Sequence, residues 1–157
     1  MKVTLLVIGK TDKSYLKEGI ADYSNRLKHY SDFSIEVIPD IKKSRNMRIE
    51  EQKIKEGERI LAHWATSKEM HLFDENGKLY SSKKFAEFLQ NKMSGGLKEL
   101  ILVVGGPYGF SEAVNSKAHS KISLSRMTFS HQLARLLCVE QIYRAFTILK
   151  GEPYHHD

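Results

Sequence analysis

Apolar residues along this chain follow two alternating patterns. Short apolar runs, of the kind that form buried strands, are separated by longer stretches whose apolar residues recur every three or four positions, as on one face of a helix. The strand-like runs cover residues 2–8, 33–38, 70–73, 99–104 and 121–124. The helix-like stretches cover about 14–30, 46–65 and 82–94, a short stretch from about 111, and about 130–149. This order is typical of an α/β fold in which a parallel sheet carries helices on both faces.

Turn and capping residues set the expected boundaries of these elements. Thr11, Asp12 and Ser14 are candidates for the N-cap of the first helix, because their side-chain oxygens can accept a backbone N–H. Residues 74–77 contain Asn-Gly, a strong turn signal, so we expect the third strand to end at a turn there. Gly57 weakens the prediction of the second helix, since glycine costs about 1 kcal/mol relative to alanine inside a helix.

The composition is that of an ordinary globular chain. Of the 157 residues, 41% are hydrophobic and 28% are charged, and we expect one domain over residues 1–157. No stretch approaches the roughly 18 apolar residues of a membrane helix, so we expect no membrane association. The single cysteine, Cys138, permits no internal disulfide and lies in an apolar stretch, where it is more typical of a core than of a nucleophile. A cytoplasmic location fits these features best.

Basic residues outnumber acidic ones and are unevenly placed. The formal charge is +6 and the isoelectric point is about 9.3, which permits a polyanionic partner such as a nucleic acid. Lys42, Lys43, Arg45 and Arg48 fall within seven residues that contain no acid. The run is either a solvated loop or a surface that contacts phosphates, and the sequence leaves both open.

A glycine-rich turn follows the fourth apolar run. In Gly105-Gly106-Pro107-Tyr108-Gly109, the glycines would let a ligand approach bare backbone. In a parallel sheet, ligands bind at the carboxyl ends of the strands, which is where this turn lies. It matches neither the Gly-x-Gly-x-x-Gly fingerprint nor the phosphate loop. A simple tight turn remains the alternative.

A second candidate segment follows the fifth apolar run. Residues 124–129 place the hydroxyls of Ser125 and Thr128 among the apolar side chains of Leu124, Met127 and Phe129. An adenine ring is bound by apolar walls and by backbone hydrogen bonds to its edge, and this segment offers both. Taken alone, it is equally well interpreted as a strand end followed by a capped helix.

The last helix is apolar on nearly every side, which predicts burial on more than one face, either within the chain or against a second subunit. Glu140 and Arg144 are spaced as an i,i+4 ion pair on it. Arg144 either forms a structural pair or contacts an anionic substrate. After the helix come Tyr154, His155 and His156, and adjacent histidines make a poor chelate without further ligands, so we expect no metal.

Taken together, these pieces resemble one family. They are the Gly-Gly-Pro-x-Gly turn, the Leu-Ser-x-Met-Thr-Phe segment at 124–129, His131, the stretch 140–145 and the terminal Tyr154-His155. The resemblance is to the small SPOUT-class methyltransferases that methylate N3 of a pseudouridine in large-subunit (23S) ribosomal RNA. It covers essentially the whole chain, including the Glu56-Gly57 pair.

The resemblance implies a C-terminal trefoil knot, an obligate homodimer and a site for S-adenosylmethionine within the knot. It also implies that the C-terminal tail reaches the active site, where Tyr154, His155 and Arg144 would be catalytic. His155 would be the general base by its ordinary pKa, and Tyr154 would stack on or hydrogen-bond the target base. The implied cofactor contacts are Leu72, Gly105, Leu124, Ser125, Arg126, Met127, Thr128 and Phe129, with Arg126 acting through its backbone.

The implied partner is 23S ribosomal RNA, most plausibly in the assembled ribosome, because so small a chain has little area of its own for RNA. Arg144 and the 42–48 cluster would then bind phosphates. Two other functions remain open from sequence. One is a non-catalytic RNA- or ribosome-binding factor of the same fold. The other is a flavodoxin-like nucleotide or flavin binder, which rests on the strand and helix order alone.

Overall fold

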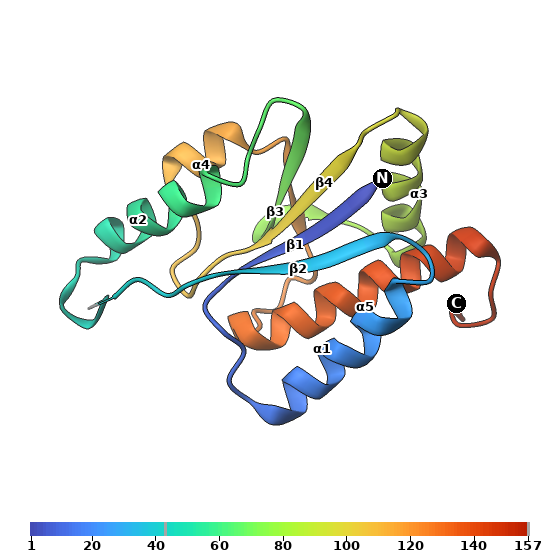
Figure 1. The fold of residues 1–157 in the computed structure, drawn as a ribbon, viewed down its shortest axis with the longest axis horizontal. Coiled ribbons are helices and arrows are strands. Elements are labelled where there is room, and N and C mark those ends of the chain that lie inside the picture. Colours follow the sequence, from blue (N-terminus) through green and yellow to red (C-terminus); the bar gives the residue numbers. More distant parts are fainter. Residues whose placement is uncertain (43, 157) are drawn as a thin grey trace.

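The apolar runs assemble into one parallel sheet at the centre of the molecule. The computed structural model describes residues 1–42 and 44–156. Five strands lie in the order β2-β1-β4-β3-β5, and every neighbouring pair is parallel (Figure 1). The strands are β1 (Lys2–Ile8), β2 (Asp32–Ile38), β3 (Lys68–Leu79), β4 (Glu99–Val104) and β5 (Ser120–Ser123). The helices are α1 (Ser14–Leu27), α2 (Ile49–Leu61), α3 (Ser82–Ser94), α4 (Glu112–Lys117) and α5 (His131–Lys150), with a 3₁₀ turn at Ser44–Asn46.

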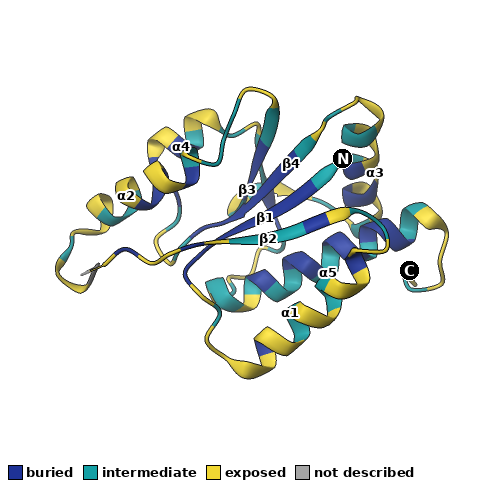
Figure 2. Cartoon of the chain, viewed as in Figure 1, coloured by how far each residue is buried: buried dark blue, intermediate teal, exposed yellow. Residues whose placement is uncertain are grey.

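Helices cover both faces of the sheet, as the α/β prediction required. Helices α1, α3 and α5 pack on one face and α2 and α4 on the other (Figures 1 and 2). Alternate residues of β1 point to opposite faces, so Val3 and Leu5 join the core under α5, whereas Leu6 and Ile8 join the core under α2 and α4. The α/β class with a parallel sheet is confirmed, and the knot and the homodimer stay predictions.

The starts of α4 and α5 are fixed by serine caps, and the end of α5 by a glycine. The hydroxyls of Ser111 and Ser130 accept backbone N–H groups at the starts of α4 and α5. Helix α5 stops at Gly151, whose φ of 69° lies in the left-handed region that suits glycine. These caps set the limits of α5, the helix that carries residues of both sites described below.

The predicted turn at 74–77 is wrong. Strand β3 runs through these residues to Leu79 and pairs with β5, although the register is irregular between Phe73 and Lys78. Gly77 lies against the backbone of Ile122, where an added Cβ would come within 2.6 Å of a main-chain nitrogen. The glycine therefore permits close strand contact rather than a reversal of the chain.

The predicted cap of α1 is also wrong. Lys13 occupies the N-cap position and makes no side-chain capping bond. Asp12 instead pairs with Gln132 of α5: its backbone N–H donates to the Gln132 Oε1 over 2.9 Å, and its carboxylate accepts from Nε2 over 2.9 Å. A tertiary contact has thus replaced the local one. Helix α1 ends at Leu27, short of the predicted residue 30.

Helix α2 is shorter than the predicted 46–65 and contains Gly57 for a packing reason. A Cβ on Gly57 would collide with the hydroxyl of Ser111 and lie 3.1 Å from Val114. Glycine lets α2 lie flush against the start of α4, which offsets its poor helix propensity. Within residues 1–42 and 44–156, no helix is both long and apolar enough to cross a membrane.

Candidate active site

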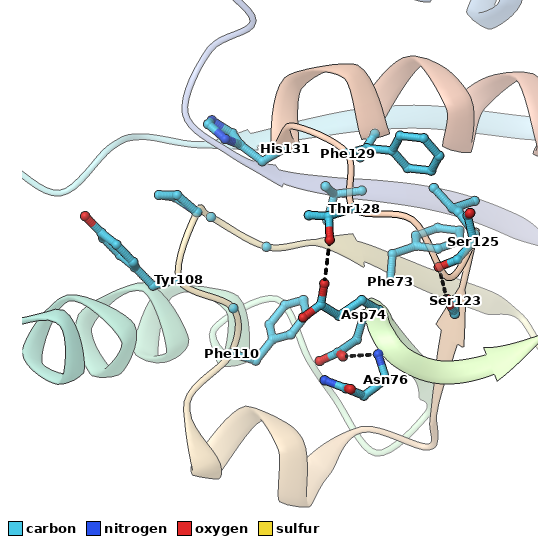
Figure 3. A pocket seen from close by; sticks show the side chains of 18 of the residues that line it. Phe73, Asp74, Asn76, Tyr108, Phe110, Ser123, Ser125, Thr128, Phe129 and His131 are labelled. Carbon is cyan, nitrogen blue, oxygen red and sulfur yellow. Dashed lines mark hydrogen bonds between the residues drawn. The ribbon is translucent and has the colours of Figure 1, made fainter.

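The carboxyl ends of β3, β4 and β5 border a cavity of about 490 Å³ (Figure 3). This volume lies in the range of sites for small molecules, roughly 300–1,000 Å³. One wall is the glycine-rich turn after β4, and the facing wall is the segment between β5 and α5. The lining residues are Lys53, Phe73–Asn76, Val104–Phe110, Ser123–Ser125, Met127–Phe129, His131 and Ala134.

Two glycines leave the backbone of the first wall bare because side chains behind it leave no room for a Cβ. A Cβ on Gly105 would lie 3.0 Å from the ring of Phe110, and one on Gly106 would lie 2.7 Å from the carboxylate of Glu56. Gly109 has a φ of 79° and needs glycine for its conformation. The turn therefore presents backbone atoms to the cavity, as the sequence indicated.

The facing wall is held by its own hydroxyls. Ser123 donates to the carbonyl of Ser125 over 2.8 Å, and the Ser125 hydroxyl accepts the N–H of Met127 over 2.9 Å. Thr128 donates across the cavity to the carboxylate of Glu75 over 3.1 Å (Figure 3). The side chain of Met127 is 75% exposed. The wall thus combines a constrained backbone with apolar side chains, which is the arrangement an adenine ring requires.

Most of the expected cofactor contacts lie together around this cavity. Gly105 lines one wall, and Leu124, Ser125, Met127, Thr128 and Phe129 line the other. The remaining two, Leu72 and Arg126, do not line it. Leu72 is fully buried in the core under α2 and α4, one residue before the lining residue Phe73, and Arg126 is exposed. All eight assignments stay predictions.

The cavity also contains charged groups that sequence reasoning did not assign. Asp74 accepts the N–H of Asn76 over 2.8 Å and lies 3.4 Å from the ammonium of Lys121. Glu75 carries the contact to Thr128, and Lys53 reaches the cavity from α2. The sequence did not identify Asp74 and Glu75 as lining residues, because the predicted turn at 74–77 ended the strand before them. They line the cavity because β3 continues past Phe73.

His131 is the first residue of α5 and lines the cavity beside the glycine-rich wall (Figure 3). Burial lowers its pKa, and the guanidinium of Arg135, one turn further along the helix, lowers it further. Asp40 and Asp12 oppose this shift more weakly. Arg135 is itself buried and donates to the backbone carbonyls of Ile8 and Gly9, which fixes the start of α5 against the end of β1.

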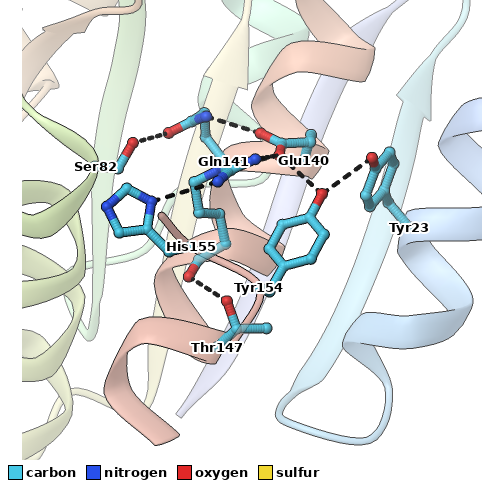
Figure 4. A network of polar contacts seen from close by, with 8 residues as sticks. Tyr23, Ser82, Glu140, Gln141, Thr147, Tyr154 and His155 are labelled. Atoms are coloured by element: carbon cyan, nitrogen blue, oxygen red, sulfur yellow. Dashed lines mark hydrogen bonds and ion pairs between the residues drawn. The ribbon is translucent and has the colours of Figure 1, made fainter. Parts of the chain in front are cut away.

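The tail residues gather around Glu140 (Figure 4). The Oε1 of Glu140 accepts from Nε of Arg144 over 3.0 Å and from the hydroxyl of Tyr154 over 3.0 Å. The guanidinium of Arg144 stacks over the Tyr154 ring at 4.7 Å, and its Nη1 lies 3.3 Å from Nδ1 of His155. The predicted Glu140–Arg144 ion pair is confirmed. From the sequence, Glu140 was expected only to pair with Arg144, whereas it also accepts from Tyr154.

These contacts raise the pKa of Tyr154 and of Arg144. Burial raises the pKa of Tyr154, as do hydrogen bonds to Tyr23 and Glu140, so its hydroxyl stays protonated at neutral pH. The bond to Glu140 raises the pKa of Arg144 further above its ordinary value. The cluster therefore presents hydrogen-bond donors around one carboxylate.

The tail cluster lies partway along α5 from the cavity. His131 begins the helix beside the cavity, and Glu140 follows nine residues later, about 14 Å along the helix axis. Tyr154 and His155 come after the helix but fold back along it, so that Tyr154 bonds Glu140 and His155 contacts Arg144 (Figure 4). No residue from 140 to 156 lines the cavity. Gln141, next to Glu140, instead lines a smaller neighbouring pocket together with Phe73 and Leu124.

The basic run follows the carboxyl end of β2. Arg45 lies in the 3₁₀ turn, Arg48 precedes α2, and Lys42, Arg45 and Arg48 are exposed. Lys43 lies outside the described residues. The position after a carboxyl strand end places these cations at the same edge of the sheet as the cavity. Among the described residues, no group of three or more His, Cys, Asp or Glu is arranged to hold a metal ion.

A parallel α/β sheet with a nucleoside-sized cavity at its carboxyl edge defines a class of small-ligand-binding proteins. A family model described as predicted SPOUT methyltransferase matches residues 1–155. The chain belongs to the SPOUT methyltransferase family. It is 58% identical to a ribosomal RNA large subunit methyltransferase H of Christiangramia forsetii over 156 residues, 99% of either chain. Proteins of the same name from Parabacteroides distasonis and Flavobacterium johnsoniae are 55% identical (157 residues, 100% of either chain) and 53% identical (156 residues, 99% of either chain).

Proposed function

We propose that this chain transfers a methyl group from S-adenosylmethionine to N3 of a pseudouridine in 23S ribosomal RNA. The observation that carries the proposal is the cavity between the glycine-rich turn and the segment 124–129, in a chain of this family. The names of the full-length relatives supply the large-subunit RNA as substrate class. A cytoplasmic location belongs to the same proposal.

The residues around the cavity fit S-adenosylmethionine. Phe73, Leu124 and Phe129 offer apolar walls for an adenine ring. The bare backbone of the glycine-rich turn offers N–H and C=O groups to its edge. Asp74 and Glu75 supply negative charge for a sulfonium. When bound, the cofactor supplies an electrophilic methyl group, so the chain's own task is to hold the target nitrogen in line with it and to manage one proton.

We further propose that the active site forms between two copies of the chain. The tail of one copy, with Arg144, Tyr154 and His155, would cover the cavity of the other, because none of these residues lines the cavity of its own chain. Exposed apolar side chains near the starts of α1 and α5 support such an interface: Tyr15 is 66% exposed and Leu133 is 36% exposed. The interface would be isologous, as in most homodimers.

The trefoil knot expected of the family is part of this proposal. In it, the segment between β5 and α5 passes through the loop that ends at the glycine-rich turn. Support comes from the two segments facing one another across the cavity and from α5 returning beneath the sheet against β4. Knots are rare, and sequence pattern alone does not indicate them.

In the composite site, the three tail residues would act as donors. The guanidinium of Arg144 suits a phosphate or a base carbonyl, and the hydroxyl of Tyr154 and the imidazole of His155 suit the carbonyl oxygens that flank N3. Exposed Arg45 and Arg48 lie at the same edge of the sheet and would bind backbone phosphates. Because this surface is small, the assembled ribosome is the proposed substrate.

The test is transfer of a labelled methyl group from S-adenosylmethionine to ribosomes that lack the modification, with deproteinised ribosomal RNA alongside. We expect label in 23S RNA, strongest on the ribosome. Tyr154→Ala and His155→Ala should lower turnover and leave cofactor affinity unchanged. A folded protein that binds no cofactor and labels neither substrate would contradict the proposal and favour a non-catalytic RNA-binding factor.

A further inference from the structure

Methylation at N3 requires that the proton on that nitrogen leave, and the one carboxylate of the tail cluster, Glu140, already accepts from Arg144 and Tyr154. Arg144 is a donor only, and the hydroxyl of Tyr154 donates to Glu140. An arginine N–H can only donate, so its 3.3 Å contact makes Nδ1 of His155 the acceptor.

The cavity itself contains one group suited to accept a proton near neutral pH. Among its described lining residues, Lys53 is a cation and Asp74 and Glu75 are carboxylates. Asp74 is engaged by Lys121 and Asn76, and Glu75 by Thr128. His131 is the only imidazole among these lining residues.

The surroundings of His131 favour the neutral form of its imidazole. On its own helix it faces the Arg135 guanidinium, and Asp12 and Asp40 approach from the segments after β1 and β2. Burial and Arg135 outweigh the two acids, so its pKa lies below the ordinary value. Arg135 is held by the carbonyl of Gly9 and by the hydroxyl of Thr11, which also fixes the position of the first turn of α5.

We propose that His131 is a catalytic residue, which accepts the N3 proton of the target base from the cofactor side of the composite site. The inference rests on the proposed function. The N3–H bond breaks and its proton passes to an imidazole nitrogen. The nitrogen pair forms the bond to the methyl carbon, and the carbon–sulfur pair returns to sulfur. The imidazolium then releases the proton to water, which restores the starting state.

The experiment compares His131→Asn and His131→Gln with His29→Asn, which changes an exposed histidine at the end of α1. Three quantities are measured: kcat against pH on ribosomes, the affinity for S-adenosylhomocysteine by calorimetry, and the imidazole titrations by NMR in histidine-labelled protein. The signal missing from the His131→Asn spectrum identifies the His131 resonance.

We expect kcat of the wild type to rise with pH and to level off once the pH exceeds the pKa of His131, which lies below the ordinary value of 6.5. The His131 resonance should titrate with the same midpoint as the rate. Both His131 variants should lose roughly 100-fold or more in kcat, within the usual range for a general base, and should lose the pH-dependent rise. Their affinity for S-adenosylhomocysteine should change less than threefold, and His29→Asn should behave as wild type.

Full turnover with an unchanged pH profile in the His131 variants would overturn the inference. So would a His131 resonance that titrates above the midpoint of the rate profile. Lost cofactor affinity with unchanged kcat at saturation would also overturn it, because it would make His131 a binding residue. Absence of methyl transfer by the wild type is a different failure, and it would remove the proposed function instead.

Discussion

The cavity and the tail cluster, which share helix α5, are built on opposite principles. At the start of the helix, His131 borders a cavity of about 490 Å³ whose walls are bare glycine backbone and apolar side chains. Further along it, Arg144, Tyr154 and Glu140 satisfy one another by hydrogen bonds and stacking. The cavity leaves room for a ligand, and the tail cluster arranges donors around a single carboxylate.

This difference shows why neither part suffices for the proposed chemistry. The cavity has the volume of a nucleoside site, but no residue from 140 to 156 of the same chain lines it. The tail cluster offers donors but encloses no space of comparable size. A second copy that lays its tail over the cavity is the arrangement we propose to bring the two together.

The largest effect should come from separating the two copies. Gly19 of α1 packs against Leu136 of α5, so Tyr15 and Leu133, one turn earlier on each helix, lie near each other at the surface. Tyr15→Asp combined with Leu133→Asp should give a folded monomer, because both side chains are exposed, and should abolish methyl transfer. Analytical ultracentrifugation and the labelling assay measure the two effects.

A matched control is Val37→Asp, which changes an apolar residue of β2 that is 47% exposed. It should leave the oligomer and its turnover unchanged. A fully active monomer of the Tyr15/Leu133 variant would show that one chain completes the site by itself.

The next effect concerns the tail cluster alone. Glu140→Gln removes the charge that holds Arg144 and Tyr154, so we expect kcat to fall roughly 100-fold, about 2.7 kcal/mol of transition-state stabilisation. Cofactor affinity should stay within twofold, because Glu140 does not line the cavity. Calorimetry and single-turnover rates separate these quantities. Weakened cofactor binding at unchanged rate would reverse the roles assigned to the cavity and the tail cluster.

A smaller effect should follow a change in the glycine-rich wall. In Gly106→Ala, the added Cβ would lie 2.7 Å from the Glu56 carboxylate. Accommodating it should cost about 1–3 kcal/mol. We therefore expect S-adenosylhomocysteine to bind about tenfold more weakly, or weaker still. Combining Gly106→Ala with Glu56→Ala removes the collision and should restore part of the affinity. If the double variant binds no better than Gly106→Ala alone, the steric explanation is wrong.

The smallest effect should come from the basic surface. Arg48→Ala should weaken binding to ribosomal RNA a few-fold at moderate salt and lower the salt-dependence slope by about one. The matched control is Lys98→Ala, an exposed cation just before β4 and therefore at the opposite edge of the sheet. Equal losses for both variants, measured by filter binding over a salt series, would show that binding depends on net charge alone.

Sequence predicted the parts of this molecule that local chemistry controls. Buried parallel strands appear as apolar runs, and serine caps such as Ser111 act within one turn of chain, so the sheet and most helices could be predicted. Gly57 and Gly77 were misjudged because the reason for each lies in a distant segment: Ser111 for the first and Ile122 for the second. Asp12 failed as a cap because Gln132, far along the chain, binds it instead.

The candidate site divides in the same way. Glycines and hydroxyls of the two walls could be identified from their types and from their place after strands. Asp74 and Glu75 could not be identified as lining residues, because their position depends on the path of β3. The distance between cavity and tail depends on where the tail folds back along α5, which a list of residues does not reveal.

The most direct measurement mixes two variants that are each impaired in a different part of the proposed site, at a concentration of S-adenosylmethionine well below saturation. Gly106→Ala carries a damaged cavity and an intact tail, and Glu140→Gln carries the reverse. If each site takes its cavity from one copy and its tail from the other, mixed dimers contain one sound site, and random mixing should restore about a quarter of wild-type methyl transfer. Activity no higher than the average of the two variants alone, in preparations shown to exchange subunits, would contradict a site shared between copies.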